Sequence, residues 1–524
     1  MNSVIGGLAQ RRRAKAFMVL GTGSDVGKSL VTAALCRYLA RRGIAVAPFK
    51  AQNMSLNSAV TPDGKEIGRA QALQAEAAGI APSVDMNPIL LKPSSSEGAQ
   101  VVLHGERFGT VHAADYRGRN RERFWPAVLE SYDRLAANYE AIVLEGAGSP
   151  AEINLRDGDI VNMAMAHAAD ARCMLVGDID RGGVFAAIYG TLALLDERDR
   201  ARIAGFTINK FRGDRSLLEP GILEIERRCE RRCFGVLPYI RNLQLDEEDS
   251  LALERRRLGA PWGARRDDER LRIAVLAFPY LSNFTDFESL ASEPSVDLRY
   301  TDRCDDVAYA DVAILPGSKN TIADLQWLRE RRLDVALQKT GRVLGICGGM
   351  QMLGRRIEDP HGVEAGGTHE ALAMLPLSTV MLCEKTTIAV RGTHLATGET
   401  IGGYEIHVGD TSYESQSLPF AEIEDERTAT RRRDGARTAD DRVTGTYLHG
   451  IFDDDAFRHR YLERLRASVG LGDLFDRRFI ARERERSLDE LADVIERELD
   501  LASFFSPRNL HGTEEGLQRE PQRR

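Results

Sequence analysis

Short apolar runs alternate with stretches of helical spacing along the first half of the chain. The runs occupy residues 17–20, 45–49, 141–144, 173–176 and 203–208. Alternating strands and helices are typical of βαβ units, whose strands are parallel. We therefore expect residues 16–240 to form an α/β domain around a mainly parallel sheet.

A second series of the same kind follows a change in composition. Residues 241–270 are dense in charge, which predicts a solvated linker. Apolar runs return at residues 271–277, 312–315 and 343–346, with a later segment around 445–449. The expected fold class is therefore α/β with two domains, the second spanning residues 271–465.

The last part of the chain adds a helix to this plan. Residues 428–441 are polar and predict a loop, whereas Ser487–Glu490 resembles a capping box that starts a helix. The residues that fit one face of this helix are Leu488, Leu491, Ile495 and Leu499. We expect residues 466–524 to be a helical extension with a polar tail, and residues 1–15 to be a short N-terminal extension.

Composition narrows the class of protein. The chain has 524 residues, of which 43% are hydrophobic and 29% charged, as in globular proteins. Its formal net charge of −8 argues against a general nucleic-acid binder. No apolar run approaches the roughly 18–20 residues that cross a bilayer. Seven cysteines without a paired framework favour a reducing compartment, and the N-terminal pattern is the reverse of a secretory signal. We expect a cytoplasmic protein that binds neither nucleic acid nor membrane, while its oligomeric state stays open.

One cysteine lies at a predicted corner between a strand and a helix. Cys347 is the centre of the sequence Gly345-Ile-Cys-Gly-Gly349, and an elbow of this type exposes a nucleophile on a sharp turn. Free backbone N–H groups at such a corner can hold an oxyanion. We expect these donors to be the N–H groups of Gly348 and of Gly317, which follows the run 312–315.

A thiol that hydrolyses an amide needs a base. His449 follows a predicted strand and is the expected base among ten histidines. His407 is a rival, and His361 and His369 lie in a Gly-rich loop.

A glycine-rich segment near the start indicates a phosphate-binding loop. It follows the run 17–20 and ends in Gly27-Lys28-Ser29, which offers backbone freedom, a cation and a metal-binding hydroxyl. A strict P-loop has glycine at the position of Thr22, but here that glycine lies one residue earlier. The expected ATP-binding residues are Gly21, Thr22, Gly23, Gly27, Lys28 and Ser29.

Other polar residues follow the carboxyl ends of predicted strands, where open α/β sheets bind ligands. We expect these residues to lie near the bound phosphate and the substrate, on the ligand-binding edge of the sheet: Lys50, Asn53, Asp178, Asp180 and Arg181. Asn209 closes the run 203–208, and we expect it to contact the adenine edge.

The shifted loop resembles dethiobiotin synthetase and its relatives, which form carboxyl phosphates from ATP. This resemblance implies that Glu145, at the end of the run 141–144, binds Mg²⁺ together with Ser29. It also implies that Lys50 contacts both the phosphate and the substrate carboxylate.

The region around Cys347 and His449 resembles the class I (triad) glutamine amidotransferases, which implies a flavodoxin-like domain. Most members carry His-x-Glu, but Gly450 and Ile451 follow His449 here. This departure matches the cobalamin-pathway subgroup, which is expected to work with a Cys–His pair.

Cys229 and Cys233 form a further cysteine pair. No second pair lies nearby, so we expect them to be neighbours on a charged helix, with a zinc site as the alternative.

Longer segments resemble the cobyric acid synthase family over roughly residues 16–465. They are residues 47–58, 85–93, 178–185 and 278–286. The resemblance implies amidation of four peripheral carboxylates (b, d, e and g) of a corrinoid, adenosylcobyrinic acid a,c-diamide, to give adenosylcobyric acid. ATP, Mg²⁺ and glutamine are the implied cofactors and co-substrate, and ammonia attacks an acyl phosphate.

Two other interpretations remain at this point. An a,c-diamide synthase uses the same chemistry on an earlier corrinoid but should lack the run 50–58. A partitioning-type P-loop ATPase carries a second lysine near the start of its loop, where this chain has Thr22 and Gly23. That class also does not explain Cys347, and a non-catalytic corrinoid-binding module explains neither loop.

Overall fold

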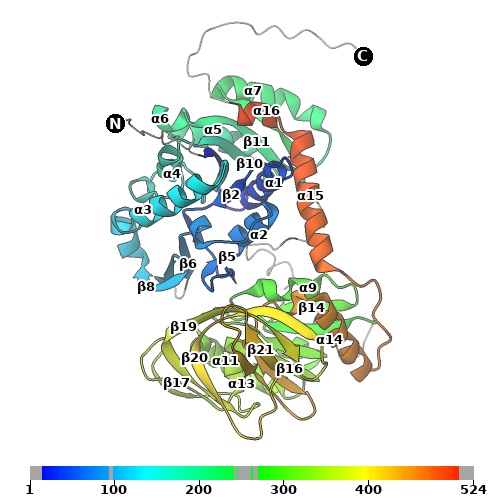
Figure 1. Ribbon diagram of the computed structural model, residues 1–524. Coiled ribbons are helices and arrows are strands. Elements are labelled where there is room, and N and C mark those ends of the chain that lie inside the picture. The colour runs from blue at the N-terminus through cyan, green and yellow to red at the C-terminus, as the bar shows by residue number, and fades with distance from the viewer. Residues whose placement is uncertain are drawn as a thin grey trace, which may run out of the picture.

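The structure is a computed structural model that describes residues 14–93, 98–240, 243, 245, 261–263 and 269–506. Two large domains lie one above the other in Figure 1. Each has its own central sheet and its own buried apolar core. The expected two-domain α/β fold is therefore confirmed.

The N-terminal domain is built on a six-stranded sheet in which all neighbouring strands are parallel. In spatial order the strands are β12 (Arg232–Pro238), β11 (Ile203–Phe211), β10 (Arg172–Asp178), β1 (Lys15–Gly21), β9 (Ala141–Glu145) and β2 (Val46–Phe49). Their central residues are almost fully buried, as expected for a parallel sheet covered on both faces.

Helices cover this sheet. They are α1 (Lys28–Ala40), α2 (Arg69–Ala77), α3 (Ala113–Asn138), α4 (Met163–Ala168), α5 (Val184–Leu194), α6 (Glu197–Arg200) and α7 (Glu219–Cys229). Cys229 ends α7 and Cys233 lies on β12. The expectation that the two cysteines are neighbours on one helix was therefore wrong. No group of three or more metal-ligating side chains occurs among the described residues.

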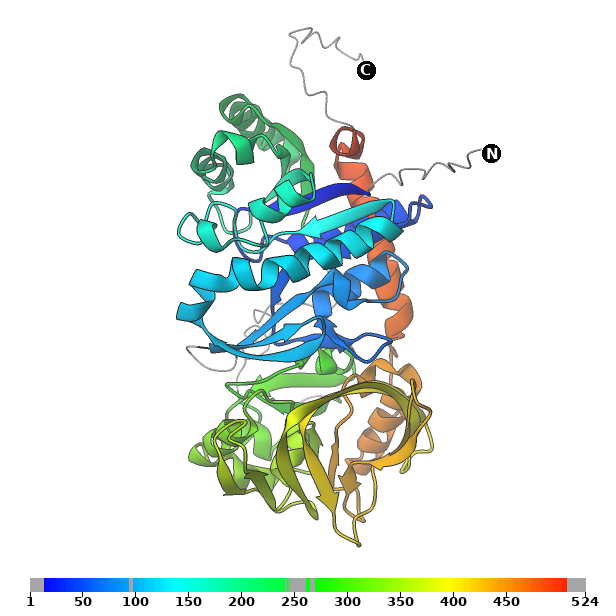
Figure 2. The same ribbon diagram turned by 60° about the vertical axis from the view of Figure 1, so that its left-hand side comes forward.

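Two small sheets lie on the side of this domain that faces the second domain (Figure 2). One contains β3 (Gln52–Met54), β6 (Ile89–Pro93), β7 (Gly98–Leu103) and β8 (Glu106–His112), and the other β4 (Ser58–Val60) and β5 (Glu66–Gly68). Arg107 on β8 donates a hydrogen bond to the carbonyl oxygen of Cys383 in the second domain, at 3.2 Å. The small sheets therefore form part of the contact between the domains.

The C-terminal domain contains the expected parallel sheet and a second sheet. In spatial order the first sheet has β14 (Val296–Thr301), β13 (Leu271–Leu276), β15 (Val312–Leu315), β16 (Arg342–Ile346), β24 (Val443–Thr446) and β23 (Ala436–Arg437). Only β23 runs antiparallel to its neighbour. The second sheet has β18 (Gly367–Glu370), β17 (Arg356–Asp359), β19 (Leu377–His394), β21 (Ala421–Asp425) and β22 (Arg431–Asp434), with β20 (Thr400–Tyr413) paired to β19.

The helices of this half are mostly short. They are α9 (Glu288–Ala291), α10 (Cys304–Ala308), α11 (Thr321–Glu330), α12 (Leu333–Leu337), α13 (Gly348–Leu353), α14 (Asp455–Ser468), α15 (Ile480–Glu498) and α16 (Leu501–Phe505). None of the described helices has both the length and the apolar character of a bilayer span.

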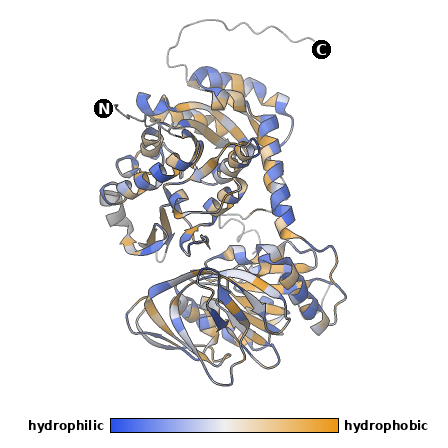
Figure 3. Cartoon of the chain, viewed as in Figure 1, coloured by the Kyte–Doolittle hydropathy of each residue, from blue (hydrophilic) through white to orange (hydrophobic). Residues whose placement is uncertain are grey.

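Helix α15 leaves the C-terminal domain and packs along the N-terminal domain, as both ribbon views show (Figures 1 and 2). Its apolar residues Leu488, Leu491 and Ile495 are buried in the same core cluster as residues of α1. Its outer face is polar and appears largely blue in Figure 3. The apolar face that the sequence predicted is therefore confirmed, and its partner is the distant first domain.

Two local expectations were wrong. Helix α15 begins at Ile480, so Ser487 lies inside it, buried, and is no cap. The polar run 428–441 contains strands β22 and β23 rather than only a loop.

Most of the predicted linker 241–270 lies outside the described residues. Within it, Trp262 is buried and donates from its backbone to Asp306 at 2.8 Å and from its indole to Asp297 at 2.9 Å. This part of the segment is anchored on the second domain instead of being solvated.

Candidate active sites

Cys347 lies at the corner between β16 and α13. Its φ of 53° and ψ of −112° are strained for a residue with a Cβ atom. Two glycines allow the corner. A Cβ at Gly349 would lie 1.9 Å from the carbonyl oxygen of Leu315, and one at Gly345 would lie 2.7 Å from the backbone of Gly349. The thiol is therefore held where strand, strained turn and helix start meet, as in a nucleophile elbow.

His449 follows β24 and is almost fully buried. Its backbone pairs with Tyr404 on β20, since each N–H donates to the other residue's carbonyl oxygen, at 2.8 and 3.2 Å. Ring atom Nδ1 lies 2.6 Å from Oδ2 of Asp286. Ring atom Nε2 is buried and has no hydrogen-bond partner among the described residues. One ring nitrogen is thus held by a carboxylate, and the other is left for proton exchange.

Electrostatics favour the charged form of this imidazole. Burial alone lowers the pKa of His449, but the charge and hydrogen bond of Asp286 and the proximity of Cys347 outweigh burial and raise the pKa to about 10. The structure therefore brings together the predicted nucleophile and the predicted base.

Asp286 is the site residue that sequence reasoning missed. It lies in the short 3-10 turn Phe284–Phe287 and is 3% exposed. Its Oδ1 accepts the backbone N–H of Gly450 at 3.1 Å, so one carboxylate contacts both the ring and the next residue. Asp286 is therefore the carboxylate in contact with His449, for which the sequence suggested no partner. The available signal was that Asp286 is the single acidic residue of the segment 278–286.

The two predicted oxyanion donors lie close to the candidate pair, Gly348 next to Cys347 in the chain and Gly317 beside the ring of His449. Gly348 is the first residue of α13, and a Cβ there would lie 3.1 Å from the backbone nitrogen of Ser318. A Cβ at Gly317 would lie 3.1 Å from Cε1 of His449. Gly348 and Ser318 both line the pocket around Cys347. The N–H of Ser318 is thus a further candidate donor.

The rival histidines have other partners. His407 lines the same pocket, but its ring stacks on Tyr447 with centroids 3.7 Å apart, and Nε2 lies 3.5 Å from Oε2 of Glu405. His369 lies 2.8 Å from the carbonyl oxygen of Gly366 through Nε2. His449 therefore has the better position for a base, because a carboxylate orients it at 2.6 Å.

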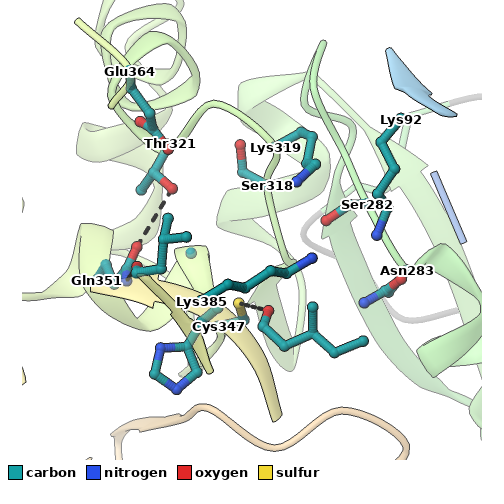
Figure 4. Close-up of a pocket in the computed structure, with 14 residues that line it drawn as sticks. Lys92, Ser282, Asn283, Ser318, Lys319, Thr321, Cys347, Gln351, Glu364 and Lys385 are labelled. Atoms are coloured by element: carbon teal, nitrogen blue, oxygen red, sulfur yellow. Dashed lines mark hydrogen bonds between the residues drawn. The ribbon is translucent and has the colours of Figure 1, made fainter. Parts of the chain in front are cut away.

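A pocket of about 480 Å³, part of it open to solvent, surrounds the thiol (Figure 4). It is lined by Lys92, Ser282, Asn283, Ser318, Lys319, Thr321, Cys347, Gly348, Gln351, Glu364, Lys385, Ile406, His407 and Val408. Lys92 belongs to β6, so the first domain supplies part of the wall.

The predicted phosphate-binding loop joins β1 to α1. Gly27 caps α1 with a φ of 96°, which suits glycine. Lys28 donates through Nζ to the carbonyl oxygens of Gly23 at 2.7 Å and Gly148 at 3.2 Å. Thr22 donates from its backbone to Val176 on β10 at 3.0 Å. The lysine thus lies across a loop that opens at a helix N-terminus, a combination that suits phosphate.

A buried carboxylate lies beside this loop. Oε1 of Glu145 accepts hydrogen bonds from Ser29 and from Lys50, both at 2.8 Å, and Oε2 accepts one from Gln74 at 2.5 Å. Burial alone raises the pKa of Glu145, but the charge of Lys50 and these hydrogen bonds hold it below its ordinary value. The structure therefore brings together Lys50, Glu145 and Ser29, with the carboxylate charged.

Asn209 and Lys210 bind the backbone of the loop. The Asn209 amide donates to the carbonyl oxygen of Val26 at 2.9 Å, and Lys210 donates to that of Asp25 at 2.5 Å. A Cβ at Gly27 would lie 2.2 Å from Nδ2 of Asn209. Asn209 thus contacts the loop backbone, and contact with adenine stays a prediction.

The turn after β10 also approaches the loop. Asp178 accepts from Lys210 at 2.9 Å, and Arg181 pairs with Asp25 at 3.1 Å. Asp180 pairs with Arg212 at 3.3 Å. This turn therefore lies beside the phosphate-binding loop through its own ion pairs.

Asn53 lies on β3, in one of the small sheets. It is 3% exposed and donates to Gln71 at 3.0 Å. Asn53 therefore contacts a polar side chain of α2.

The segment that follows Asn53 reaches the second active site. The backbone N–H of Ser58 donates to Oδ1 of Asn283 at 3.1 Å, and its carbonyl oxygen accepts the Tyr404 hydroxyl at 3.1 Å. The ring of Tyr404 stacks on that of His449, with centroids 5.4 Å apart. The first domain is thus two contacts away from the predicted base.

Comparison with known domain families assigns both halves of the chain. Residues 17–252 match the CobQ/CobB/MinD/ParA nucleotide binding domain. Residues 272–457 match the CobB/CobQ-like glutamine amidotransferase domain. The two sites described above fall within these two regions.

Full-length relatives are also similar. A cobyric acid synthase of Klebsiella pneumoniae is 48% identical over 95% of this chain and 98% of its own length. A cobyric acid synthase of Cereibacter sphaeroides is 48% identical over 94% of this chain and 99% of its own.

Solved structures are similar over less than half of the chain. The cell division protein MinD of Aquifex aeolicus is 14% identical, with a TM-score of 0.27, over 44% of this chain and 84% of its own. The signal recognition particle receptor FtsY of Elizabethkingia anophelis is 13% identical, with a TM-score of 0.26, over 44% of this chain and 59% of its own.

Proposed function

The chain belongs to the cobyric acid synthase family, a glutamine-dependent amide ligase of cobalamin synthesis, and from this premise we propose its substrate and its steps. The substrate is adenosylcobyrinic acid a,c-diamide, and amidation of its b, d, e and g carboxylates gives adenosylcobyric acid. The observation that carries the proposal is the coexistence of the Cys347–His449–Asp286 arrangement with the phosphate-binding loop in one chain.

Glutamine hydrolysis begins at Cys347. The thiolate sulfur attacks the side-chain amide carbon, and the N–H groups of Gly348, Gly317 and Ser318 are the candidates to hold the oxyanion. His449 then gives its Nε2 proton to the leaving ammonia, which leaves a glutamyl thioester. Water attacks that thioester with Nε2 as the base, and glutamate departs. Asp286 orients the ring and stabilises its charge throughout.

Activation of the carboxylate takes place at the first site. A carboxylate oxygen of the corrinoid attacks the γ-phosphorus of ATP, ADP leaves, and an acyl phosphate forms. Lys28 and Lys50 neutralise the charge that develops on the phosphate oxygens. Ammonia attacks the acyl carbon, and inorganic phosphate departs. The supporting feature is that Lys28, Lys50 and the α1 N-terminus lie around one loop.

The residues fit a Mg²⁺ ion at this loop. Ser29 Oγ and Glu145 Oε1 lie 2.8 Å apart, and Mg²⁺ prefers such oxygen ligands. When bound, it supplies charge neutralisation on the phosphates. Lys50 forms an ion pair with the same carboxylate oxygen of Glu145 at 2.8 Å.

Two related functions fit less well. An a,c-diamide synthase acts on an earlier corrinoid, and the relatives of 48% identity bear the name cobyric acid synthase instead. A partitioning ATPase leaves the Cys347 site without a role.

All seven cysteines are free thiols, which supports a cytoplasmic location.

Mass spectrometry of the corrinoid product tests the proposal. The a,c-diamide is incubated with the protein, ATP, Mg²⁺ and glutamine. The expected result is four successive mass losses, each of the size that replaces OH by NH₂. A product that stops after two losses, or a substrate that is left unchanged while cobyrinic acid is amidated, would contradict it. Omission of ATP is the control.

A further inference from the structure

Three lysines approach the pocket around Cys347. Lys92 comes from β6 of the first domain, Lys385 from β19, and Lys319 from the segment after β15. Figure 4 shows their amino groups pointing into one region near Ser282 and Asn283. Three cations from two domains therefore converge beside the predicted nucleophile.

One carboxylate is shared by two of these cations. Glu66 accepts Lys92 through Oε1 at 2.5 Å and Lys385 through Oε2. Both carboxylate oxygens of Glu66 are therefore occupied, and its side chain is 1% exposed. Lys319 donates instead to the neutral amide of Gln100, at 2.6 Å. The cluster of Lys92, Lys319, Lys385 and Glu66 thus carries an excess of positive charge.

Like charges that lie close together in a partly buried cluster destabilise one another, because little water screens them. Burial, then the positive charges of Lys385 and Lys92, hold the pKa of Lys319 well below its ordinary value. Arg107 adds a further positive charge, and Glu66 only partly offsets the sum. Glu364 also lines the pocket, but its Oε2 accepts the backbone N–H of Ile322 at 2.9 Å. An anion bound among the lysines would relieve this repulsion.

The lysines also keep donors for such an anion. Each ammonium has three N–H groups. Lys92 gives one to Glu66 and one to Ser58 Oγ at 2.8 Å. The hydrogen bonds above take one each from Lys319 and Lys385. Among the described residues, each lysine thus keeps an N–H for a ligand.

The substrate of this pocket carries a suitable anion. Glutamine presents its side-chain amide to the thiol, and its α-carboxylate lies at the other end of the molecule. We propose that Lys92, Lys319 and Lys385 bind the α-carboxylate of glutamine, an assignment that rests on Cys347 being the glutaminase nucleophile. Because Lys92 belongs to the synthetase domain, the glutamine site is complete only when the two domains are in contact.

Steady-state glutaminase kinetics with two substrates test this subsite. One substrate is glutamine, and the other is 4-aminobutanamide, which is glutamine without the α-carboxylate. For the unchanged protein we expect kcat/KM to fall about 100-fold with 4-aminobutanamide, since charge-assisted hydrogen bonds are lost. Lys319→Met and Lys385→Met should each raise KM for glutamine about 10-fold or more and leave 4-aminobutanamide within about threefold.

Matched variants separate binding from damage. Lys319→Arg keeps the charge and should restore most of the glutamine KM. Lys339→Met removes an exposed lysine and should match the unchanged protein. Amidation with ammonium chloride reports folding of each variant. If Lys319→Met loses amidation with ammonium chloride, and so is misfolded, the subsite is tested with Lys319→Arg and Lys385→Met and the same two substrates.

Two results would overturn the subsite. One is an unchanged KM for glutamine in both methionine variants. The other is an equal loss with both substrates, which would indicate a clamp between the domains instead of a ligand site. A wrong assignment of Cys347 as the glutaminase nucleophile would give a different result, because the Cys347→Ser variant would then still hydrolyse glutamine.

Discussion

Nδ1 of His449 lies 2.6 Å from Oδ2 of Asp286, although 163 positions separate the two residues in the chain. The carboxylate comes from a turn after the first strand of the second domain, whereas the histidine follows the last strand of its parallel run. Parallel strands bring both ends to one edge of the sheet. His449 thereby contacts a carboxylate although none stands next to it in the chain.

Asp286→Asn should lower glutaminase kcat about 10²–10⁴-fold, because the amide no longer stabilises the imidazolium or its orientation. The pKa of His449 should fall from its raised value of about 10, since burial then dominates. The high-pH limb of the kcat/KM profile should therefore move to lower pH. Asp305→Asn, at an exposed position, is the control. An unmoved limb would contradict the assignment.

The same titration affects stability. A folded-state pKa of about 10 exceeds the ordinary value of 6.5, so the charged ring stabilises the fold. This contribution is complete below about pH 6.5 and is lost as the pH rises toward about 10. The difference in unfolding free energy between the unchanged protein and Asp286→Asn should shrink over that window. Urea titrations at several pH values measure it.

Cys347→Ser should abolish glutamine hydrolysis, at a cost on the order of 4–8 kcal/mol of barrier. Amidation with ammonium chloride should continue, because the first site needs only ammonia. The His449→Ala variant should resemble Cys347→Ser, while His407→Ala should keep glutaminase activity. Ammonia release and corrinoid mass are the two measurements. If His407→Ala loses glutaminase activity and His449→Ala keeps it, the base is His407 instead of His449.

Lys28→Ala should reduce amidation about 10²–10³-fold with either glutamine or ammonium chloride, since phosphate activation precedes both. Hydrolysis of ATP and amide formation should fall together. Lys15→Ala changes an exposed lysine on β1 and is the matched control. Normal ammonia-dependent turnover by Lys28→Ala would remove the loop from the reaction.

Tyr404→Phe should loosen the coupling between the sites. The hydroxyl joins the Ser58 carbonyl oxygen at 3.1 Å while the ring stacks on His449. Its loss leaves a buried acceptor unsatisfied, at about 1–3 kcal/mol. We expect more glutamine hydrolysed per amide formed, compared with Tyr309→Phe at an exposed position. An unchanged ratio of glutamine hydrolysed to amide formed would mean that the contact between Tyr404 and Ser58 does not couple the two sites.

Leu488→Ala should destabilise the protein by about 2–5 kcal/mol, because the side chain is fully buried between α15 and the first domain. Leu223→Ala, at a position 62% exposed on α7, should change stability by less than about 0.5 kcal/mol. Urea titration measures both variants. Equal effects would mean that α15 does not contribute to the core of the first domain.

Local patterns were enough for the elements and for the separate chemical groups. The apolar runs predicted the parallel strands, because strands buried on both faces read as continuous apolar segments. The elbow at Cys347 and the loop before Lys28 were visible because glycine spacing reports a local backbone shape. The apolar face of α15 was visible for the same reason, although its first residue was not.

The order of residues along the chain was therefore enough for the fold class, the family resemblance and the nucleophile elbow with its candidate base. Three relationships became visible only in the folded molecule: Asp286 contacts His449, α15 returns to the first domain, and Lys92 reaches the Cys347 pocket. These relationships join residues from distant parts of the chain, and no spacing records them. They depend on how strand ends and domain faces meet in space, which local propensity does not encode.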